Sequence, residues 1–231
     1  MFTDSLDIRL KTIAYMVRHG ARLADVGCDH GYLISALARD GIITGGIACD
    51  INKGPLDNAK VEIARCRLED KIECRLGNGL GPVKCEEVDD IVIAGMGGEL
   101  IAAIIEGSGW NSFEGKHFIL QPMSRAAYLR RWLKANGFCV REERACSSNK
   151  HVYTVISAVY SGEKVELAEY DLYCYLGELI KDKSEDADEY LRRTVSELEK
   201  QRKGASFNDP EREKKLAKLI SEMNTVLEEG R

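Results

Sequence analysis

The chain has 231 residues, of which 44% are hydrophobic and 31% are charged, the balance of an ordinary soluble globular protein. Its net charge of −5 excludes a protein that coats nucleic acid through a general positive field, so any polyanion has to be held by local basic patches. Residues 163–231 carry 13 Lys and Arg against 18 Asp and Glu, whereas residues 1–162 carry 20 of each. The excess negative charge therefore belongs to the last part of the chain.

Targeting and metal-binding patterns are absent from the sequence. The first 20 residues mix charges of both signs and lack the apolar core of a signal peptide, and no apolar run is long enough to span a bilayer. The cysteines occur singly, without a CxxC pair, which favours free thiols over structural zinc. We expect a cytoplasmic monomer without a metal. The eight cysteines are at positions 28, 49, 66, 74, 85, 139, 146 and 174.

The predicted elements alternate between helix and strand. The first is a helix, because Leu6, Leu10, Ile13 and Val17 recur at spacings of four, three and four; Thr3 or Asp4 is expected to cap it, and residues 19–20 to close it. Residues 138–161 predict two strands around a polar loop. Between these, strands are expected at 21–27, 44–51, 71–80, 88–98 and 116–122, and helices at 32–41, 54–68, 99–108 and 125–137.

This alternation predicts an α/β fold with a doubly wound parallel sheet, closed by an antiparallel hairpin. The first domain is expected to cover residues 1–162. Residues 163–231 form a second unit, in which apolar residues keep a helical spacing on either side of the break at 203–211. This spacing predicts a helical hairpin with coiled-coil character. It is either a solvated appendage that stabilises the domain or a part that contacts the substrate.

The turn after the first strand, "DVGCDHG", carries unusual polar chemistry. Ligands of doubly wound sheets bind at the carboxyl ends of the strands, and Gly27 allows a tight turn there. A dinucleotide fingerprint requires G-x-G-x-x-G, but its middle glycine is replaced by Asp29, which would repel a pyrophosphate. The cofactor at this turn is therefore expected to be cationic or free of phosphate, as S-adenosylmethionine is.

The next three strands support this prediction. Asp50, at the end of the second strand, is placed to take both ribose hydroxyls. Asn78, in "GNGL", faces the expected adenine, and "IAGMGG" at 93–98 leaves backbone exposed where substrate and methyl group meet. His30 and Met96 lie in the same turns, Met96 as a pocket wall. Four such features after four successive strands carry more weight than any one alone.

The sequence resembles a known family. The segments "RLKTIAYMV", "ARLADVGCDHGYL", "ACDINKGP", "GNGL", "IVIAGMGGELI" and "ILQP" are similar to those of the bacterial tRNA (adenine-22-N1)-methyltransferase family, the TrmK type, over about residues 5–160. The resemblance implies a class I, Rossmann-like methyltransferase sheet with a coiled-coil-like tail. It also implies S-adenosylmethionine as donor and N1 of a tRNA adenine as acceptor.

Carried over by position, the cofactor site consists of Asp25, Gly27, Asp29, Asp50, Asn78, Gly79 and Gly95. The family pattern differs at two of these positions: an aspartate is expected where Asn78 stands, and a glutamate where Asp50 stands. Asn78 still offers hydrogen-bonding groups to an adenine edge, whereas Asp50 is one methylene shorter and must approach the ribose more closely.

Two residues are candidates for the methyl-transfer step. Neutral adenine N1 needs no base before attack, but the product ring is cationic, so a carboxylate can stabilise the developing charge. Asp29 is the candidate, with proton acceptance as an alternative role. Gln121, before Pro122, is expected to hold the base edge, with bracing of its own loop as the alternative.

An adenine inside folded tRNA has to be turned out of its stack, which requires a grip on the flanking phosphates. Arg9 and Arg125 are the main candidates, in a basic set completed by Lys11, Lys53, Arg130, Arg131 and Lys134. The acidic hairpin is then expected to act by shape more than by charge.

Three other functions remain open at this stage. One is a methyltransferase for a different RNA, a small molecule or a protein. The second is a nicotinamide-dependent oxidoreductase, against which Asp29 and the missing G-x-G-x-x-G count. The third is a non-catalytic RNA-binding module that has kept the sheet.

Overall fold

The computed structural model describes residues 1–148 and 150–229 of the chain. Residue 149, in the polar loop expected between the last two strands, and residues 230–231, at the end of the expected hairpin, lie outside the described residues. Within the described chain, no helix has the length and hydrophobicity needed to cross a membrane.

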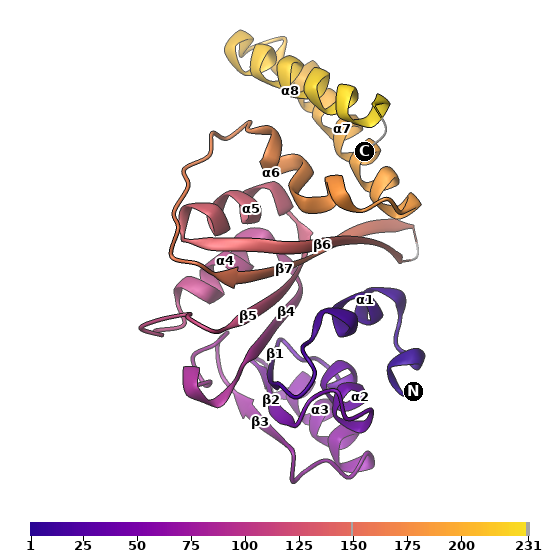
Figure 1. Cartoon of the computed structure of the whole chain (residues 1–231), viewed down its shortest axis with the longest axis vertical. Coiled ribbons are helices and arrows are strands. Elements are labelled where there is room, and N and C mark those ends of the chain that lie inside the picture. The colour runs from indigo at the N-terminus through magenta and orange to yellow at the C-terminus, as the bar shows by residue number, and fades with distance from the viewer. Residues whose placement is uncertain (149, 230–231) are drawn as a thin grey trace.

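A seven-stranded sheet forms the centre of the protein, in the order β3-β2-β1-β4-β5-β7-β6 (Figure 1). Strands β1 to β5 are parallel, and β7 runs antiparallel to both β5 and β6. This is the predicted α/β fold, a doubly wound parallel sheet with an antiparallel hairpin at one end. The strands are β1 (Arg22–Val26), β2 (Gly45–Asp50), β3 (Ile72–Leu76), β4 (Asp90–Gly97), β5 (His117–Ser124), β6 (Phe138–Ser148) and β7 (His151–Tyr160).

Helices cover both faces of the sheet because each strand presents apolar side chains on alternate sides. On β1, Leu23 packs in the cluster with α1, α2 and α3, whereas Ala24 and Val26 pack with α4 and α5. The covering helices are α1 (Ile8–Met16), α2 (Tyr32–Arg39), α3 (Lys53–Arg65), α4 (Gly98–Glu106) and α5 (Ala126–Ala135).

Two expected helix boundaries are wrong. Thr3 and Asp4 belong to the 3-10 turn η1 (Thr3–Ser5), and α1 is capped by Asp7, whose side chain accepts a hydrogen bond from the Leu10 amide. The break expected from Gly204 starts later, because α7 (Glu185–Ala205) runs through that glycine and α8 begins at Pro210. A Cβ at Gly204 would meet no neighbouring atom, so no close packing requires a glycine there, and the helix includes it at the usual entropic cost.

The segment after β7 forms α6 (Leu172–Leu176), η3 (Gly177–Lys181), α7 and α8 (Pro210–Glu228). The last two helices pack side by side beyond the edge strand β6 (Figure 1). They share a separate apolar cluster that includes Leu191, Leu198, Leu216 and Met223. Packing of these side chains, rather than intrinsic helix propensity, holds the charged pair of helices together.

Arg130, on α5, joins this helical segment to the sheet. Its guanidinium donates to both carboxylate oxygens of Glu143 on β6 and to the carbonyl oxygens of Cys174 and Tyr175. The backbone amide of Glu178 donates to the same carboxylate. Burial of this ion pair is tolerated because nearly every polar atom finds a partner.

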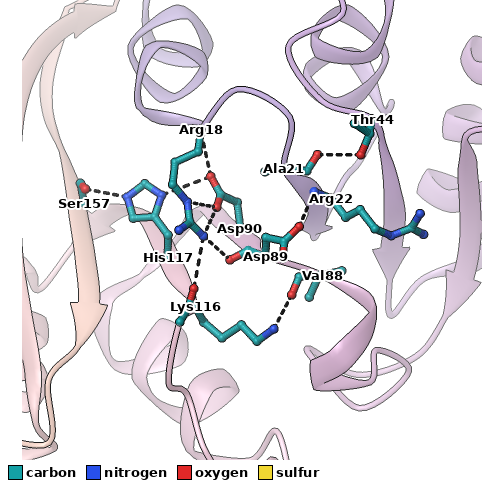
Figure 2. Close-up of polar contacts among 11 residues, drawn as sticks. Arg18, Ala21, Arg22, Thr44, Val88, Asp89, Asp90, Lys116, His117 and Ser157 are labelled. Carbon is teal, nitrogen blue, oxygen red and sulfur yellow. Dashed lines mark hydrogen bonds and ion pairs between the residues drawn. The ribbon is translucent and has the colours of Figure 1, made fainter.

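A polar cluster lies at the amino ends of β1, β4 and β5 (Figure 2). The buried carboxylate of Asp90 accepts hydrogen bonds from the backbone N–H and the Nε of Arg18, and lies 3.2 Å from Nδ1 of His117. On its other side, the ring of His117 is hydrogen-bonded to Ser157 at 2.7 Å. Burial raises the pKa of Asp90, but hydrogen bonds from His117 and Arg18 outweigh it and hold the pKa below its usual value.

Replacing Asp90 with Ala is expected to lower the free energy of unfolding by about 3 kcal/mol, because Arg18 and His117 lose a buried, charged partner. Chemical denaturation at pH 7 measures this loss. Since the native pKa of Asp90 is lowered, its contribution is present above the unfolded pKa and is lost as the pH falls through the native value. Asp70→Ala, at an exposed turn, is the control, and an equal loss there would contradict this role.

Candidate functional site

A cavity of about 600 Å³ opens at the carboxyl ends of β1 to β4. It lies where the strand order reverses between β1 and β4, the position at which doubly wound sheets bind their ligands. All nine residues expected at the cofactor site line it: Asp25, Gly27, Asp29, His30, Asp50, Asn78, Gly79, Gly95 and Met96. The sheet therefore brings together side chains from four separate turns.

The turn between β1 and α2 has a tight backbone. Gly27 has a φ of +72°, and a Cβ at this position would collide with the Cε of Met96. The backbone amides of Gly27 and Cys28 both donate to the carbonyl oxygen of Cys49. Asp29 has a φ of +49°, and its side chain is 70% exposed at the cavity. The turn thus presents a carboxylate where a dinucleotide-binding turn has bare backbone.

The carboxyl group of Asp25 is buried beneath this turn. Burial raises its pKa to about 7, and Asp50 acts in the same direction, while a hydrogen bond from the backbone of Ile34 opposes the shift. Among the described residues no Lys, Arg or His forms an ion pair with Asp25. The cavity floor therefore favours a cation, which would stabilise the ionised form.

Asp50 and Asn78 follow adjacent strands and line the same cavity. Asp50 ends β2 and is 9% exposed; its Oδ1 accepts a hydrogen bond from the amide of Asn52, which fixes the carboxylate at the start of α3. Asn78 is exposed after β3. These positions suit a ribose diol and a purine edge, respectively.

Arg9 reaches into this cavity from α1. Its Nη1 donates to Oε1 of Gln121 at 3.0 Å, and that oxygen also accepts from the amide of Gly95. The sequence predicted Arg9 only as a phosphate contact, because its partner in the structure, Gln121, lies 112 residues away. No local sequence pattern could have shown this contact.

The prediction that Gln121 holds the base edge is wrong. Gln121 is fully buried, and its amide nitrogen donates to the carbonyl oxygen of Pro122 and contacts the sulfur of Met123. With its oxygen shared by Arg9 and Gly95, the side chain has nothing left for a ligand. It braces the ends of β4 and β5, which was the alternative.

Large apolar side chains surround the mouth of the cavity. Each is about half exposed although it is close to the buried core: Tyr32 (50%), Ile51 (60%), Leu100 (52%) and Met123 (46%). A contiguous exposed apolar patch of this kind is typical of a ligand-binding or interaction site. No sequence pattern marks these four residues, since isolated apolar side chains do not form a periodic motif.

A second hollow, here called the α5–α7 groove, has a volume of about 510 Å³. It lies between residues 122–131 on one side and α7 and α8 on the other, and Met123 borders both this groove and the cofactor cavity. Arg125 and Arg131 line it. Arg125 is exposed and paired with Glu99, and Arg131 lies beside the ring of Tyr128.

Of the four remaining basic residues, Lys11, Lys53 and Lys134 lie elsewhere, and the prediction for the fourth, Arg130, is wrong. The Arg130 side chain is 1% exposed and paired with Glu143, so it cannot contact an RNA phosphate. Lys53 is exposed at the first turn of α3, and Lys11 is half-buried on α1. The amine of Lys134 lies 4.8 Å from the ring centre of Tyr173.

The cavity holds thiols but no metal-binding cluster in the described part of the chain. All eight cysteines are free. Burial raises the pKa of the Cys49 thiol to about 12 and that of Cys28 further still. Both are therefore protonated near neutral pH, and they pack as small apolar side chains.

Comparison with known proteins gives consistent matches. The methyltransferase domain family matches residues 6–156. The tRNA (adenine(22)-N(1))-methyltransferase of Bacillus subtilis is 38% identical over 154 residues, which are 66% of this chain and 64% of that protein. The chain thus spans about two thirds of the length of this curated relative.

Solved structures match over nearly the whole chain. Streptococcus pneumoniae Sp1610 in complex with S-adenosyl-L-methionine is 31% identical, with a TM-score of 0.82, covering 96% of this chain and 99% of that one. The B. subtilis m1A22 tRNA methyltransferase TrmK is 29% identical, with a TM-score of 0.81 and 97% coverage of both chains. These matches include the C-terminal helices as well as the sheet.

Asp25→Asn is expected to stabilise the ligand-free protein at pH 8 and to have little effect near pH 4. Because the native pKa is raised, the wild-type protein loses stability as the pH rises from the unfolded pKa to about 7, up to a few kcal/mol, and the loss then levels off. Urea unfolding of both proteins from pH 4 to 8 measures the difference. Equal pH profiles for the two proteins would contradict the burial of an unpaired carboxyl group.

Proposed function

The chain belongs to the TrmK-type tRNA (adenine-22-N1)-methyltransferase family, and we propose that it transfers a methyl group from S-adenosylmethionine to N1 of adenine 22 in tRNA. One observation carries the proposal: a cavity at the strand reversal lined by three carboxylates, Asp25, Asp29 and Asp50, with Asp29 where a dinucleotide fingerprint has its middle glycine. A relative of the same fold binds S-adenosyl-L-methionine.

The cavity fits this cofactor group by group. Asp25 and Asp29 face a ligand that carries an ammonium and a sulfonium, and their carboxylates offset that charge. Asp50 accepts hydrogen bonds from the ribose hydroxyls, and Asn78 meets the adenine edge through its amide. His30, Gly79, Gly95 and Met96 complete the wall. When bound, the cofactor supplies an electrophilic methyl group.

The protein's contribution to the reaction is positioning and charge stabilisation. Adenine N1 attacks with its own lone pair, so no residue has to remove a proton first. When the bond from N1 to the methyl carbon forms, the bond from that carbon to the donor sulfur breaks, so the sulfur would leave as a neutral thioether and the ring would gain the positive charge. The exposed carboxylate of Asp29 lowers the energy of that charge. Arg9, fixed by Gln121 at the edge of the cavity, is placed to hold a phosphate of the target nucleotide.

The apolar rim supports access by a base that has left its stack. Leu100 and Met123 offer two exposed, flexible contacts for a flipped purine, which has to be gripped outside the helix before N1 reaches the cofactor. Lys53, Arg125 and Arg131 then hold flanking phosphates. A monomer in the cytoplasm, where tRNA is modified, is the simplest setting for this activity.

The activity test is transfer of labelled methyl groups to unmodified tRNA, followed by mass spectrometry of the nucleosides and mapping of the modified position. The wild-type protein is expected to produce 1-methyladenosine at position 22. Asp29→Ala is expected to lower kcat about 10²-fold or more, because the developing charge loses its carboxylate. Asp57→Ala, on the exposed side of α3 and paired with Lys60, is the matched control.

Near-normal turnover by Asp29→Ala would remove the assignment of that residue. Methylation of a protein or a small molecule instead of tRNA would remove the assignment of the acceptor. Calorimetry with S-adenosylmethionine and with NAD separates the methyltransferase from an oxidoreductase, since only the first ligand is expected to bind.

Binding of the cofactor is expected to release protons near pH 7. The pKa of Asp25 is about 7 without ligand, and a bound cation favours the ionised carboxylate, so affinity for S-adenosylmethionine rises with pH up to about 7 and then levels off. Calorimetry in buffers of different ionisation enthalpy counts the protons released. Asp25→Asn should bind more weakly and abolish the release; release that persists in the variant would assign it to another group.

A further inference from the structure

The α5–α7 groove has a chemistry that differs from the acidic character of the C-terminal helices. Its lining includes five arginines, from α5, α7, α8 and the turn before α5, against two glutamates, Glu169 and Glu197. The helical hairpin is net negative as a whole. Its positive side chains Arg193 and Arg212 nevertheless face the catalytic sheet across the groove.

Two of these arginines are free of carboxylates. The other three form ion pairs: Arg130 with Glu143, Arg125 with Glu99, and Arg193 with Glu189. Across the described ranges, 1–148 and 150–229, no carboxylate forms an ion pair with Arg131 or Arg212. Arg131 lies over Tyr128, and Arg212 is held by neutral oxygens of Tyr170 and Gln201. Such guanidiniums suit bidentate contacts to phosphate.

Aromatic rings alternate with these cations. The tyrosines of the groove come from α5, β7, α7 and the segment around α6, and all are half-buried, so their rings are held in place. Arginines with fixed aromatic faces form the usual surface for unpaired nucleotides, whose bases stack while the backbone is neutralised. The rings are those of Tyr128, Tyr153, Tyr170, Tyr175 and Tyr190.

The groove also continues the proposed active site. Met123 borders both hollows, so the cofactor cavity and the groove adjoin at this residue. The two walls keep a defined spacing because Arg130 and Glu143 fix α6 and η3 to the sheet. Gly177 closes this joint, since a Cβ there would collide with both side chains of the ion pair.

We propose that the α5–α7 groove binds an unpaired stretch of the substrate RNA next to the target adenine, with Arg131 and Arg212 contacting its phosphates. The hairpin is then a substrate-binding part, acting through local charge as well as shape. This inference rests on the proposed function for the identity of the RNA.

The test compares Arg131→Gln/Arg212→Gln with the control Lys71→Gln/Lys214→Gln in the full chain. The control removes the same charge: Lys71 is exposed before β3, and Lys214 lies about 200° around α8 from Arg212. The arginine variant is expected to bind unmodified tRNA at least 10-fold more weakly. The negative slope of log K against log salt should become shallower by about 1.5, because two phosphate contacts are lost. The control should stay within twofold of wild type.

Two readouts separate this role from a loss of folding. Affinity for S-adenosylmethionine should be unchanged in the arginine variant, and the KM for tRNA should rise more than kcat falls. Glu197→Gln, which removes a carboxylate from the groove, should tighten tRNA binding two- to threefold, a gain that misfolding cannot produce.

Wild-type affinity and salt slope in the arginine variant would overturn the inference, and so would weaker binding by Glu197→Gln. The proposed function fails separately: a wild-type protein that binds tRNA with this salt dependence but methylates no tRNA would keep the groove and lose the reaction. Normal methylation by the wild-type protein, together with unchanged tRNA binding by the arginine variant, would keep the reaction and remove the groove.

Discussion

An unpaired buried carboxyl group at the carboxyl end of β1 is the constraint that explains the site. Asp25 loses most of its hydration, which raises its pKa to about 7, and no described cation offsets it. Its backbone is fixed by pairing with both β2 and β4, so the group cannot turn outward without breaking the centre of the sheet. The protein therefore stores an electrostatic cost that a cationic ligand relieves, and a ligand with a pyrophosphate would increase it.

At the opposite end of the same strands lies a buried carboxylate that does have charged and hydrogen-bonding partners. Asp90, the first residue of β4, is as buried as Asp25, but Arg18 and His117 donate to it and hold its pKa low (Figure 2). One end of the sheet thus contributes to stability and the other to binding. This division follows the general behaviour of doubly wound sheets, in which the loops at the carboxyl ends are left for the ligand.

The sequence was sufficient for those features that depend on backbone topology. Gly27, Asp50 and Asn78 could be placed together because parallel strands end at one edge, whatever their side chains contact. The contacts of individual side chains could not be predicted in this way. Arg130 was predicted to contact an RNA phosphate, yet its partners are Glu143 on β6 and the carbonyl oxygen of Cys174, 44 residues along the chain. Gln121 was misjudged for the same reason, since its partners on α1 and β4 are set by packing.

The buried ion pair of Arg130 also bears on how an acidic protein can bind a polyanion. A long-range field from a chain of charge −5 repels RNA, but screening limits that repulsion to about 10 Å at ordinary ionic strength. Inside that distance the local arrangement decides, and two walls held apart by a buried ion pair present guanidiniums at a fixed spacing. Rigid attachment of α7 and α8 matters here, because a mobile hairpin would lose in ordering entropy what its arginines gain from phosphate contacts.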